Sequence, residues 1–376
     1  TEGWAVGLRL AALAIQYEVD LSGQLDRFDG DLYEVQQYLM HEVMGAISGE
    51  ERDWLCKSAI LDRFTAELCD QLCRSDDPAQ RHSLSGKGFV RKLHDSGLFC
   101  IALDHRRQWH RYHHQFQTLL REQLHANYQP EEIRELHRRA GAWLEAHGEI
   151  ESALKHYLLS GEHGLARKTL LKHRHEAFGG EQAFRVRNWL RIVGDVASHD
   201  PELLLVRAWI AQRITRYGEV VDILAKLDDI LPTTQDYPED KLQCIRGECE
   251  ALRCIIAYWQ TDARASIAHA DLALALLPGE DAARGFAALV KIGALQMLGG
   301  IKEATTFAQA LLQQKEYRHG TVHGRLLQGL CYAYCFSGDT GSLLRTCTAL
   351  EKYGEKNQLP ETLEYARYFR GITSYQ

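Results

Sequence analysis

Residues 208–227 read AWIAQRITRYGEVVDILAKL. A small residue and an aromatic residue precede a glycine-containing turn, and an apolar stripe follows it, formed by Val220, Val221, Leu224 and Leu227. Apolar residues spaced by three and four positions predict two amphipathic helices joined at that turn. One helical hairpin cannot bury its apolar face alone, so the stretch predicts neighbouring hairpins of the same kind.

Similar pairs before a turn recur along the chain. They are Ala142-Trp143, Ala257-Tyr258, Ala294-Leu295 and Ala333-Tyr334, with turns near residues 148, 262, 300 and 338. The spacing is about 34 to 44 residues, as in tetratricopeptide-like hairpins, and the gap between 148 and 218 has room for two units. We expect the alanines to allow close helix approach. The pattern predicts an α-solenoid, and an irregular helical bundle is the alternative.

One stretch departs from the helical pattern. Residues 97–103 and 109–112 are rich in apolar and aromatic residues and flank the polar stretch 104–108, which predicts a β-hairpin. Helices are expected before it, at 51–60, 65–73 and 88–96, and after it, at 114–126. This order predicts a winged helix. The fold class is therefore mainly α, with a winged helix followed by a tetratricopeptide-like α-solenoid.

Composition restricts the class of protein. The 376 residues are 45% hydrophobic and 25% charged, with a net charge of -7, which excludes a disordered, collagen-like or coiled-coil chain. Its apolar runs are too short to cross a membrane. Ten scattered cysteines without a C-x-x-C motif predict buried or free thiols and a cytoplasmic location. Because the chain begins at Thr1 inside an apolar segment, we expect it to be part of a longer polypeptide.

Motifs for catalysis are missing from the sequence. It contains no phosphate loop, no G-x-S-x-G and no H-E-x-x-H, so we predict that this chain is not an enzyme and has no cofactor or metal of its own. His105, His110, His113 and His114 could bind zinc, but the arginines among them oppose a divalent cation.

The region around the expected hairpin is basic. Between residues 81 and 125 there are eight Lys or Arg and three acidic residues. On a winged helix this charge is compatible with a DNA-binding face, a solvated surface, or a surface turned toward phosphate or an acidic neighbour.

Four segments together resemble one family. They are 1–13 (TEGWAVGLRLAAL), 109–116 (WHRYHHQF), 136–148 (LHRRAGAWLEAHG) and 201–209 (PELLLVRAW). They are similar to the MalT-like regulators, the large ATP-binding members of the LuxR family, which are signal-transduction ATPases. The resemblance implies the end of an ATPase module at 1–30, a winged helix at 31–128 and helical repeats at 129–376.

The resemblance also implies functional residues. Gly7, Leu8, Arg9 and Leu10 match the segment near adenine, and His113 or His114 matches the histidine near the phosphate. ATP or ADP would be the cofactor of the full-length protein, bound by an ATPase domain outside this chain. Arg106, Arg107 and Arg111 would face that domain, and DNA would be bound only by a further domain beyond Gln376.

The repeats would then be the sensor of a bacterial transcription activator and would receive a small-molecule inducer or a regulatory protein. Candidate residues lining the first helices are Arg213, Tyr217, Trp259, Gln296, Gln328 and Tyr332. The alternative is a free-standing repeat scaffold that binds protein or peptide partners.

Overall fold

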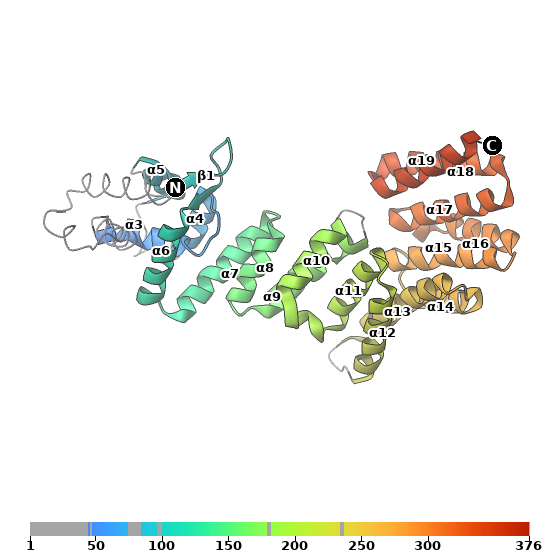
Figure 1. The fold of residues 1–376 in the computed structure, drawn as a ribbon, viewed down its shortest axis with the longest axis horizontal. Coiled ribbons are helices and arrows are strands. Elements are labelled where there is room, and N and C mark those ends of the chain that lie inside the picture. The colour runs from blue at the N-terminus through green and yellow to red at the C-terminus, as the bar shows by residue number, and fades with distance from the viewer. Residues whose placement is uncertain are drawn as a thin grey trace, which may run out of the picture. The chain divides into compact units, whose positions relative to one another are not determined.

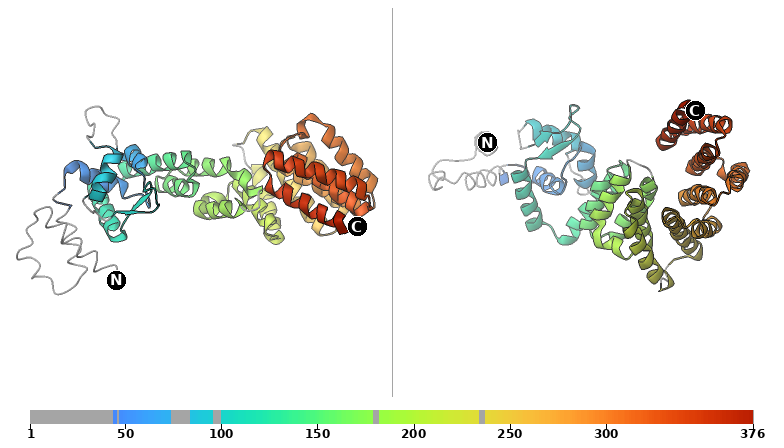
Figure 2. Two further views of the ribbon diagram at one scale, coloured as in Figure 1. Left: turned by 90° about the horizontal axis from the view of Figure 1, so that it is seen from above. Right: turned by 45° about the vertical axis from the view of Figure 1, so that its right-hand side comes forward.

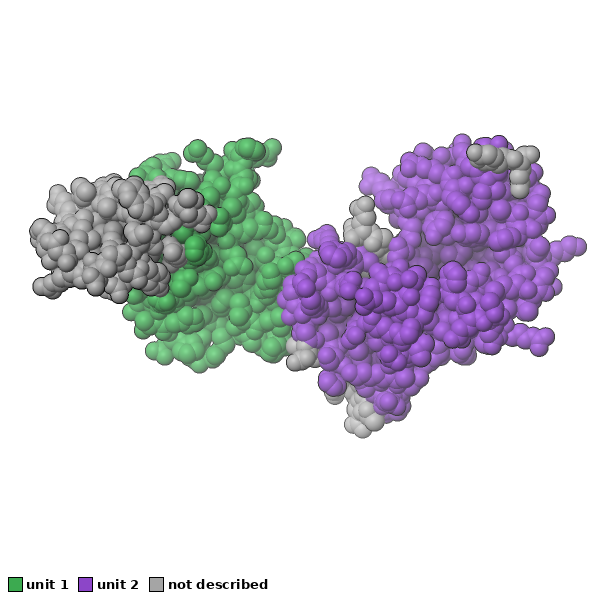
Figure 3. All heavy atoms as spheres, viewed as in Figure 1, with its two compact units in different colours: residues 1–166 green, residues 167–376 purple. Residues whose placement is uncertain are grey.

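The computed structural model describes residues 44–45, 47–73, 84–95, 100–178, 182–233 and 237–375. The chain divides into two compact units, residues 1–166 and 167–376 (Figure 3). Each unit is described by itself. Within the described residues, no helix is both long enough and apolar enough to span a membrane.

The described part of the first unit combines helices with one β-hairpin (Figure 1). Its elements are α3 (Gly49–Ser58), α4 (Ala66–Cys73), α5 (Gly86–Asp95), β1 (Cys100–Ala102), β2 (His110–Tyr112), α6 (His114–Asn127), α7 (Pro130–Ala146) and α8 (Ile150–Leu159). Ser48 starts α3 through a capping box with Glu51. The expected helices and hairpin are therefore present in the expected order.

The hairpin is antiparallel and is joined to the helices by a third extended segment. Cys100 pairs with Tyr112 in its register, and Phe64 exchanges two backbone hydrogen bonds with His110, of 2.8 and 2.9 Å. The Asp104 carboxylate accepts hydrogen bonds from two backbone amides of the turn. The Phe64 and Tyr112 rings, 4.7 Å apart, are buried with Trp54 in the core. These contacts position β2 against the helical bundle.

The second unit begins within α9, and its described residues form helices and their connecting turns. The helices are α9 (His163–Lys172), η3 (Arg174–Phe178), α10 (Gln182–Val193), η4 (Gly194–Ser198), α11 (Pro201–Arg213), α12 (Tyr217–Ile230), η5 (Leu231–Thr233), α13 (Glu239–Trp259), α14 (Ala263–Leu276), α15 (Ala282–Met297), α16 (Ile301–Gln313), η6 (Lys315–Tyr317), α17 (Gly320–Ser337), α18 (Thr340–Asn357) and α19 (Pro360–Tyr375). From α11 onward they pair as α11–α12, α13–α14, α15–α16 and α17–α18, and α19 packs on α18. The expected hairpins are therefore confirmed.

The hairpin turns share one backbone feature. In each, a residue adopts a left-handed conformation: Gly148, Thr215, Thr261, Gly299 and Gly338, with φ between 58° and 79°. Glycine accepts this conformation freely, whereas threonine adopts it at a cost of roughly 1 kcal/mol or more. Asp262 and Asp339 directly follow two of these residues and cap the next helix. Local turn chemistry therefore sets where each second helix begins.

Two details of the expected packing are wrong. Ala142 is exposed, and its neighbour Gly141 lies at the interface instead, where an added Cβ would be 2.8 Å from the Tyr157 ring. Val221 is also exposed, and Ile223 completes the buried stripe of α12. In each case the buried face of the helix is rotated by a small angle about the helix axis from the face that the sequence predicts. The other four alanines of the pattern are buried as expected: Ala208, Ala257, Ala294 and Ala333.

The cysteines behave as packing residues. All ten are free thiols, and seven of them are buried. Burial raises the pKa of Cys254 to about 11 and that of Cys249 to about 12, so both thiols are protonated at neutral pH.

Two histidines meet inside the α7–α8 hairpin. The Nδ1 atoms of His137 and His156 lie 2.8 Å apart, so one ring must donate and the other must accept. Burial, followed by the nearby charge of Arg121, lowers the pKa of His137 to about 4. Burial, followed by the His137 ring, lowers the pKa of His156 to about 4. Both rings are therefore neutral at pH 7.

This pair predicts acid sensitivity. The unfolded chain takes up protons at these sites below about pH 6.5, whereas the folded chain does so only near pH 4, so stability falls as the pH is lowered between these values. We expect replacement of both residues by Leu to remove about 4 kcal/mol of the stability difference between pH 7 and pH 5, about 2 kcal/mol for each site. Urea unfolding at the two pH values measures it. His163→Leu, an exposed change at the beginning of α9, is the control. An unchanged pH dependence in the double variant would contradict the prediction.

Candidate ligand-binding face of the helical repeats

The first helices of the second unit form one continuous surface. Successive first helices contact each other, α11 with α13, α13 with α15, α15 with α17 and α17 with α19, whereas successive second helices make at most marginal contacts. An array that is tighter on one side curves toward that side. Figure 2 shows α11 to α19 following such an arc. We call the surface of α11, α13, α15, α17 and α19 the inner face.

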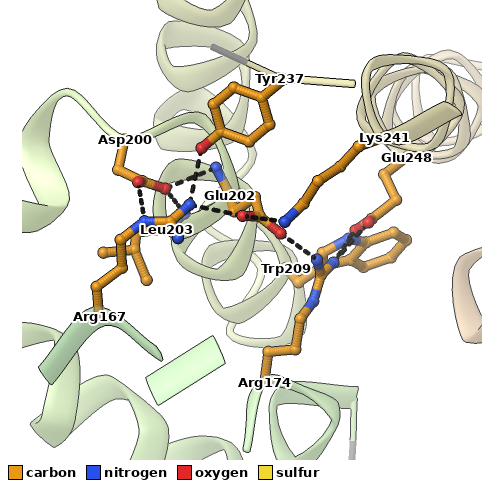
Figure 4. Close-up of polar contacts among 9 residues, drawn as sticks. All are labelled: Arg167, Arg174, Asp200, Glu202, Leu203, Trp209, Tyr237, Lys241 and Glu248. Carbon is orange, nitrogen blue, oxygen red and sulfur yellow. Dashed lines mark hydrogen bonds and ion pairs between the residues drawn. The ribbon is translucent and has the colours of Figure 1, made fainter. Parts of the chain in front are cut away.

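A network of charged side chains lies at the beginning of this array (Figure 4). We call it the buried charge network, and its members are Arg167, Arg174, Asp200, Glu202, Lys241 and Glu248. The guanidinium of Arg167 bonds Asp200 and Glu202, and the ammonium of Lys241 lies 2.9 Å from Glu202. Three cations meet three carboxylates, so the network is electrically balanced.

Glu248 is the most deeply placed member. It is 3% exposed, and both of its oxygens accept from Arg174, at 2.5 and 2.6 Å. One of them also accepts from the indole of Trp209, at 2.9 Å. Burial raises the pKa of Glu248, and the Arg174 guanidinium opposes that effect. Glu248 thereby joins η3, α11 and α13 at one point.

Aromatic stacking continues from this point along the inner face. The Trp209 ring is stacked on Phe286 of α15, with centroids 5.3 Å apart. The guanidinium of Arg325, from α17, lies 3.6 Å from the centroid of the same Phe286 ring. The four first helices α11, α13, α15 and α17 are therefore connected through side-chain contacts.

Arg325 is buried but lacks a bonded carboxylate. It is 8% exposed, and Nη1 donates to the Ala282 carbonyl at 3.2 Å. No ion pair of Arg325 occurs among the described residues. Burial lowers its pKa to about 10, so the group stays charged at neutral pH. The charges that act on it most are Glu361 and Arg213, which bond each other at 2.8 Å across the inner face, from α19 to α11.

The structure does not bring the predicted lining residues together at one site. Gln328 and Tyr332 lie one turn apart on α17, and the Tyr332 ring packs on Phe369 at 4.8 Å. Tyr217 was expected on a first helix but begins the second helix α12, because the turn ends one residue earlier. Its ring lies 6.1 Å from Trp259, which is 61% exposed at the end of α13. These two aromatics form a pair at the hairpin turns.

Gln296 is placed near the end of α15. Its Nε2 atom is buried and has no hydrogen-bond partner among the described residues. A buried amide N–H without a partner costs free energy, and a ligand acceptor that reached it would remove that cost.

The basic side chains of the wing are open to solvent. Arg106 and Arg107 belong to the turn of the hairpin and Arg111 to β2, and all three are exposed. His113 is the N-cap of α6 and His114 its first residue, with rings 4.7 Å apart. The wing thus carries exposed arginines in its turn and on β2, and the two imidazole groups follow β2 directly. Gly7, Leu8, Arg9 and Leu10 lie outside the described residues, and no cluster of three metal-ligating side chains occurs within them.

Comparison with known proteins agrees with this geometry. Residues 40–133 match the family model of the MalT winged helix domain. The chain is 29% identical over 259 residues to the HTH-type transcriptional regulator MalT of Yersinia enterocolitica, covering 68% of this chain and 27% of that protein. It is 27% identical over 335 residues to MalT of Vibrio cholerae, covering 87% and 36%.

The resemblance to the MalT-like regulators is confirmed. The matched segment contains the hairpin and both wing histidines, and the alignment with the MalT proteins extends into the repeats. The chain spans only 27% to 36% of the length of these relatives. It is thus similar to one part of a MalT protein.

A solved structure supports the expected fold class. A signal transduction ATPase with numerous domains that has a tetratricopeptide repeat sensor, from Pyrococcus horikoshii, matches with a TM-score of 0.62 and 12% identity. The match covers 98% of this chain and 56% of that one. At this identity the match shows the fold alone. A MalT-like winged helix followed by tetratricopeptide-like repeats is therefore confirmed.

Sequence reasoning missed the most unusual side chains of this MalT-like array. Glu248 stands within the apolar stripe of Ile245, Cys249 and Leu252, and Arg325 stands between buried residues of α17. A charged residue inside an apolar stripe of the sequence indicates a buried ionic group. The partner of such a charge cannot be predicted from the sequence, because Arg174 lies 74 residues from Glu248 and Ala282 lies 43 residues from Arg325.

Glu248 predicts a large effect on stability. Glu248→Ala leaves Arg174 and the Trp209 indole without their main acceptor, and we expect it to lower the free energy of unfolding by about 3 kcal/mol. Glu239→Ala is the control, since Glu239 lies on the same helix but pairs with Arg246 at an exposed site. That change should cost less than about 1 kcal/mol. Denaturant unfolding compares the two, and equal costs would contradict a structural role for the network.

Proposed function

We propose that this chain is the central sensing region of an ATP-dependent bacterial transcription activator, in the cytoplasm, and that the inner face of its repeats receives a small-molecule inducer or a regulatory partner. The main support is a MalT winged helix followed by a curved array whose inner face carries buried polar groups. Promoter recognition would belong to a domain outside this chain.

The winged helix would contact the nucleotide held by an ATPase domain outside this chain. The described residues suit the phosphate side of ATP or ADP, because exposed Arg106, Arg107 and Arg111 and the adjacent His113 and His114 can donate hydrogen bonds to anionic oxygens. When bound, the nucleotide would supply phosphate charge, and the wing would neutralise it. The segment that would face adenine lies outside the described residues.

The inner face can be tested with a matched pair of glutamines. We expect a metabolite library to contain compounds that raise the melting temperature of the purified chain, because a ligand that binds only the folded state stabilises it. Gln296→Ala should weaken such binding by about tenfold, the value of one hydrogen bond to a buried group. Gln309→Ala, on the second helix α16, should leave it unchanged.

The rival function makes the opposite prediction. A repeat scaffold would bind a peptide or protein tightly and would show no response to any metabolite. That pair of results would contradict the sensing function and favour the scaffold.

The wing can be tested in the full-length protein. We expect His113→Ala and His114→Ala together to weaken ADP binding by about tenfold, because charge-assisted hydrogen bonds to phosphate contribute at least one tenfold step in affinity. Fluorescent ADP titration measures it, with His125→Ala on the same helix as the control. Unchanged ADP affinity would contradict the assignment. Salt-sensitive binding of duplex DNA by this chain, lost on changing Arg106, Arg107 and Arg111 to Ala, would instead favour a DNA-binding wing.

A further inference from the structure

Two groups of charged side chains among the described residues of the second unit differ in their balance of positive and negative charge. The buried charge network of Figure 4 contains three cations and three carboxylates, each within bonding distance of an opposite charge. The second group contains two cations and one carboxylate: Arg213 and Glu361 form an ion pair, and Arg325 covers the Phe286 ring that is stacked on Trp209, one helical turn before Arg213. Charges taken out of water are normally paired, so the second group has one positive charge in excess.

The surroundings of Arg325 hold its guanidinium firmly in place. Its aliphatic stem packs against Gly285, where an added Cβ would lie 3.3 Å from Cδ, and the charged end lies over the Phe286 ring. An aromatic ring and one backbone carbonyl satisfy a guanidinium only in part, because it has five N–H donors in a planar fork. The fork is suited to a carboxylate or phosphate.

Of the carboxylates around Arg325, Glu361 has the largest electrostatic effect on its guanidinium, but Glu361 is bonded to another arginine. It pairs with Arg213 at 2.8 Å, and the two side chains are 37% and 23% exposed. The pair is therefore more open to solvent than Arg325, which is 8% exposed. Being partly exposed, it contributes little stability by itself and is easily exchanged.

We propose that Arg213 and Arg325 bind the anionic group of a small molecule that carries a carboxylate or a phosphate, and that Glu361 holds the place of that group in the ligand-free chain. This inference rests on the proposed sensing function and names its class of ligand. The ligand's anion would share the two guanidinium groups and displace Glu361 from Arg213. Because Glu361 is in the first turn of α19 and Arg213 ends α11, binding would release α19 from α11.

Competition between Glu361 and the ligand makes the proposal testable with simple anions. Isothermal titration of the chain with inorganic phosphate tests a phosphate group, and titration with succinate tests a carboxylate group. Glu361→Gln removes the competing charge, and we expect it to tighten binding of at least one of the two. Arg325→Met added to that variant should weaken binding by about tenfold or more, because it removes the charge-assisted hydrogen bonds.

A second pair of residues provides the control. Glu351→Gln also frees an arginine of α19, Arg370, but at the exposed surface between α18 and α19. We expect this variant to bind phosphate and succinate as the wild type does. Arg325→Met should also fold, because replacing a buried charge by an apolar side chain of similar volume is commonly neutral or stabilising.

Three results would overturn the proposal. They are failure of both anions to bind the Glu361→Gln variant, equal binding after Arg325→Met, and equal tightening by Glu351→Gln. A neutral metabolite whose binding depends on Gln296 but not on Arg325 would also overturn it, while leaving the proposed sensing function in place.

Discussion

The ion pair between Glu248 and Arg174 determines how several helices of the second unit are positioned. A carboxylate that is 3% exposed is stable only when its oxygens are bonded, and here the bonds come from η3 and α11 while Glu248 itself is on α13. The entry into the repeats and the first two hairpins are consequently held in one register. Apolar packing alone would allow neighbouring helices to slide by a turn, whereas bonds with fixed partners do not.

The same interaction is connected to α17 through two aromatic rings. Trp209 bonds Glu248 and stacks on Phe286, and Phe286 supports Arg325. A structural network and the proposed binding group are thus joined by direct contacts within one unit. Contacts of this kind allow two sites to influence each other, although coupling requires two arrangements of the connecting element. The exchangeable pair of Arg213 and Glu361 offers such a choice.

The sequence predicts the turns of this protein well, because turn residues act locally. Gly148, Gly299 and Gly338 mark three hairpins, and Asp262 marks a fourth, by chemistry that needs no tertiary partner. Helix faces are predicted less sharply, so Ala142 was expected where Gly141 lies. The binding group could not be predicted as a whole. Of its members the sequence predicts only Arg213, by its place on a first helix. Glu361 lies 148 residues away in sequence, and only the curvature of the array brings the two together.

Arrays of helical hairpins are usually regarded as modular, since each unit contacts only its neighbours and can be exchanged or removed. In one part of this array the buried charge network prevents a repeat from being exchanged or removed without breaking ion pairs. Its members extend from Arg167 to Glu248, and any chain boundary placed between them leaves a buried charge without its counterion. Beyond Glu248, the turn at residues 278–281 separates helices that share mainly apolar contacts. The segment from α9 to α13 is therefore a single block, and the Trp209–Phe286 stack and the Arg213–Glu361 ion pair extend its contacts beyond the neighbouring repeat, to α15 and α19.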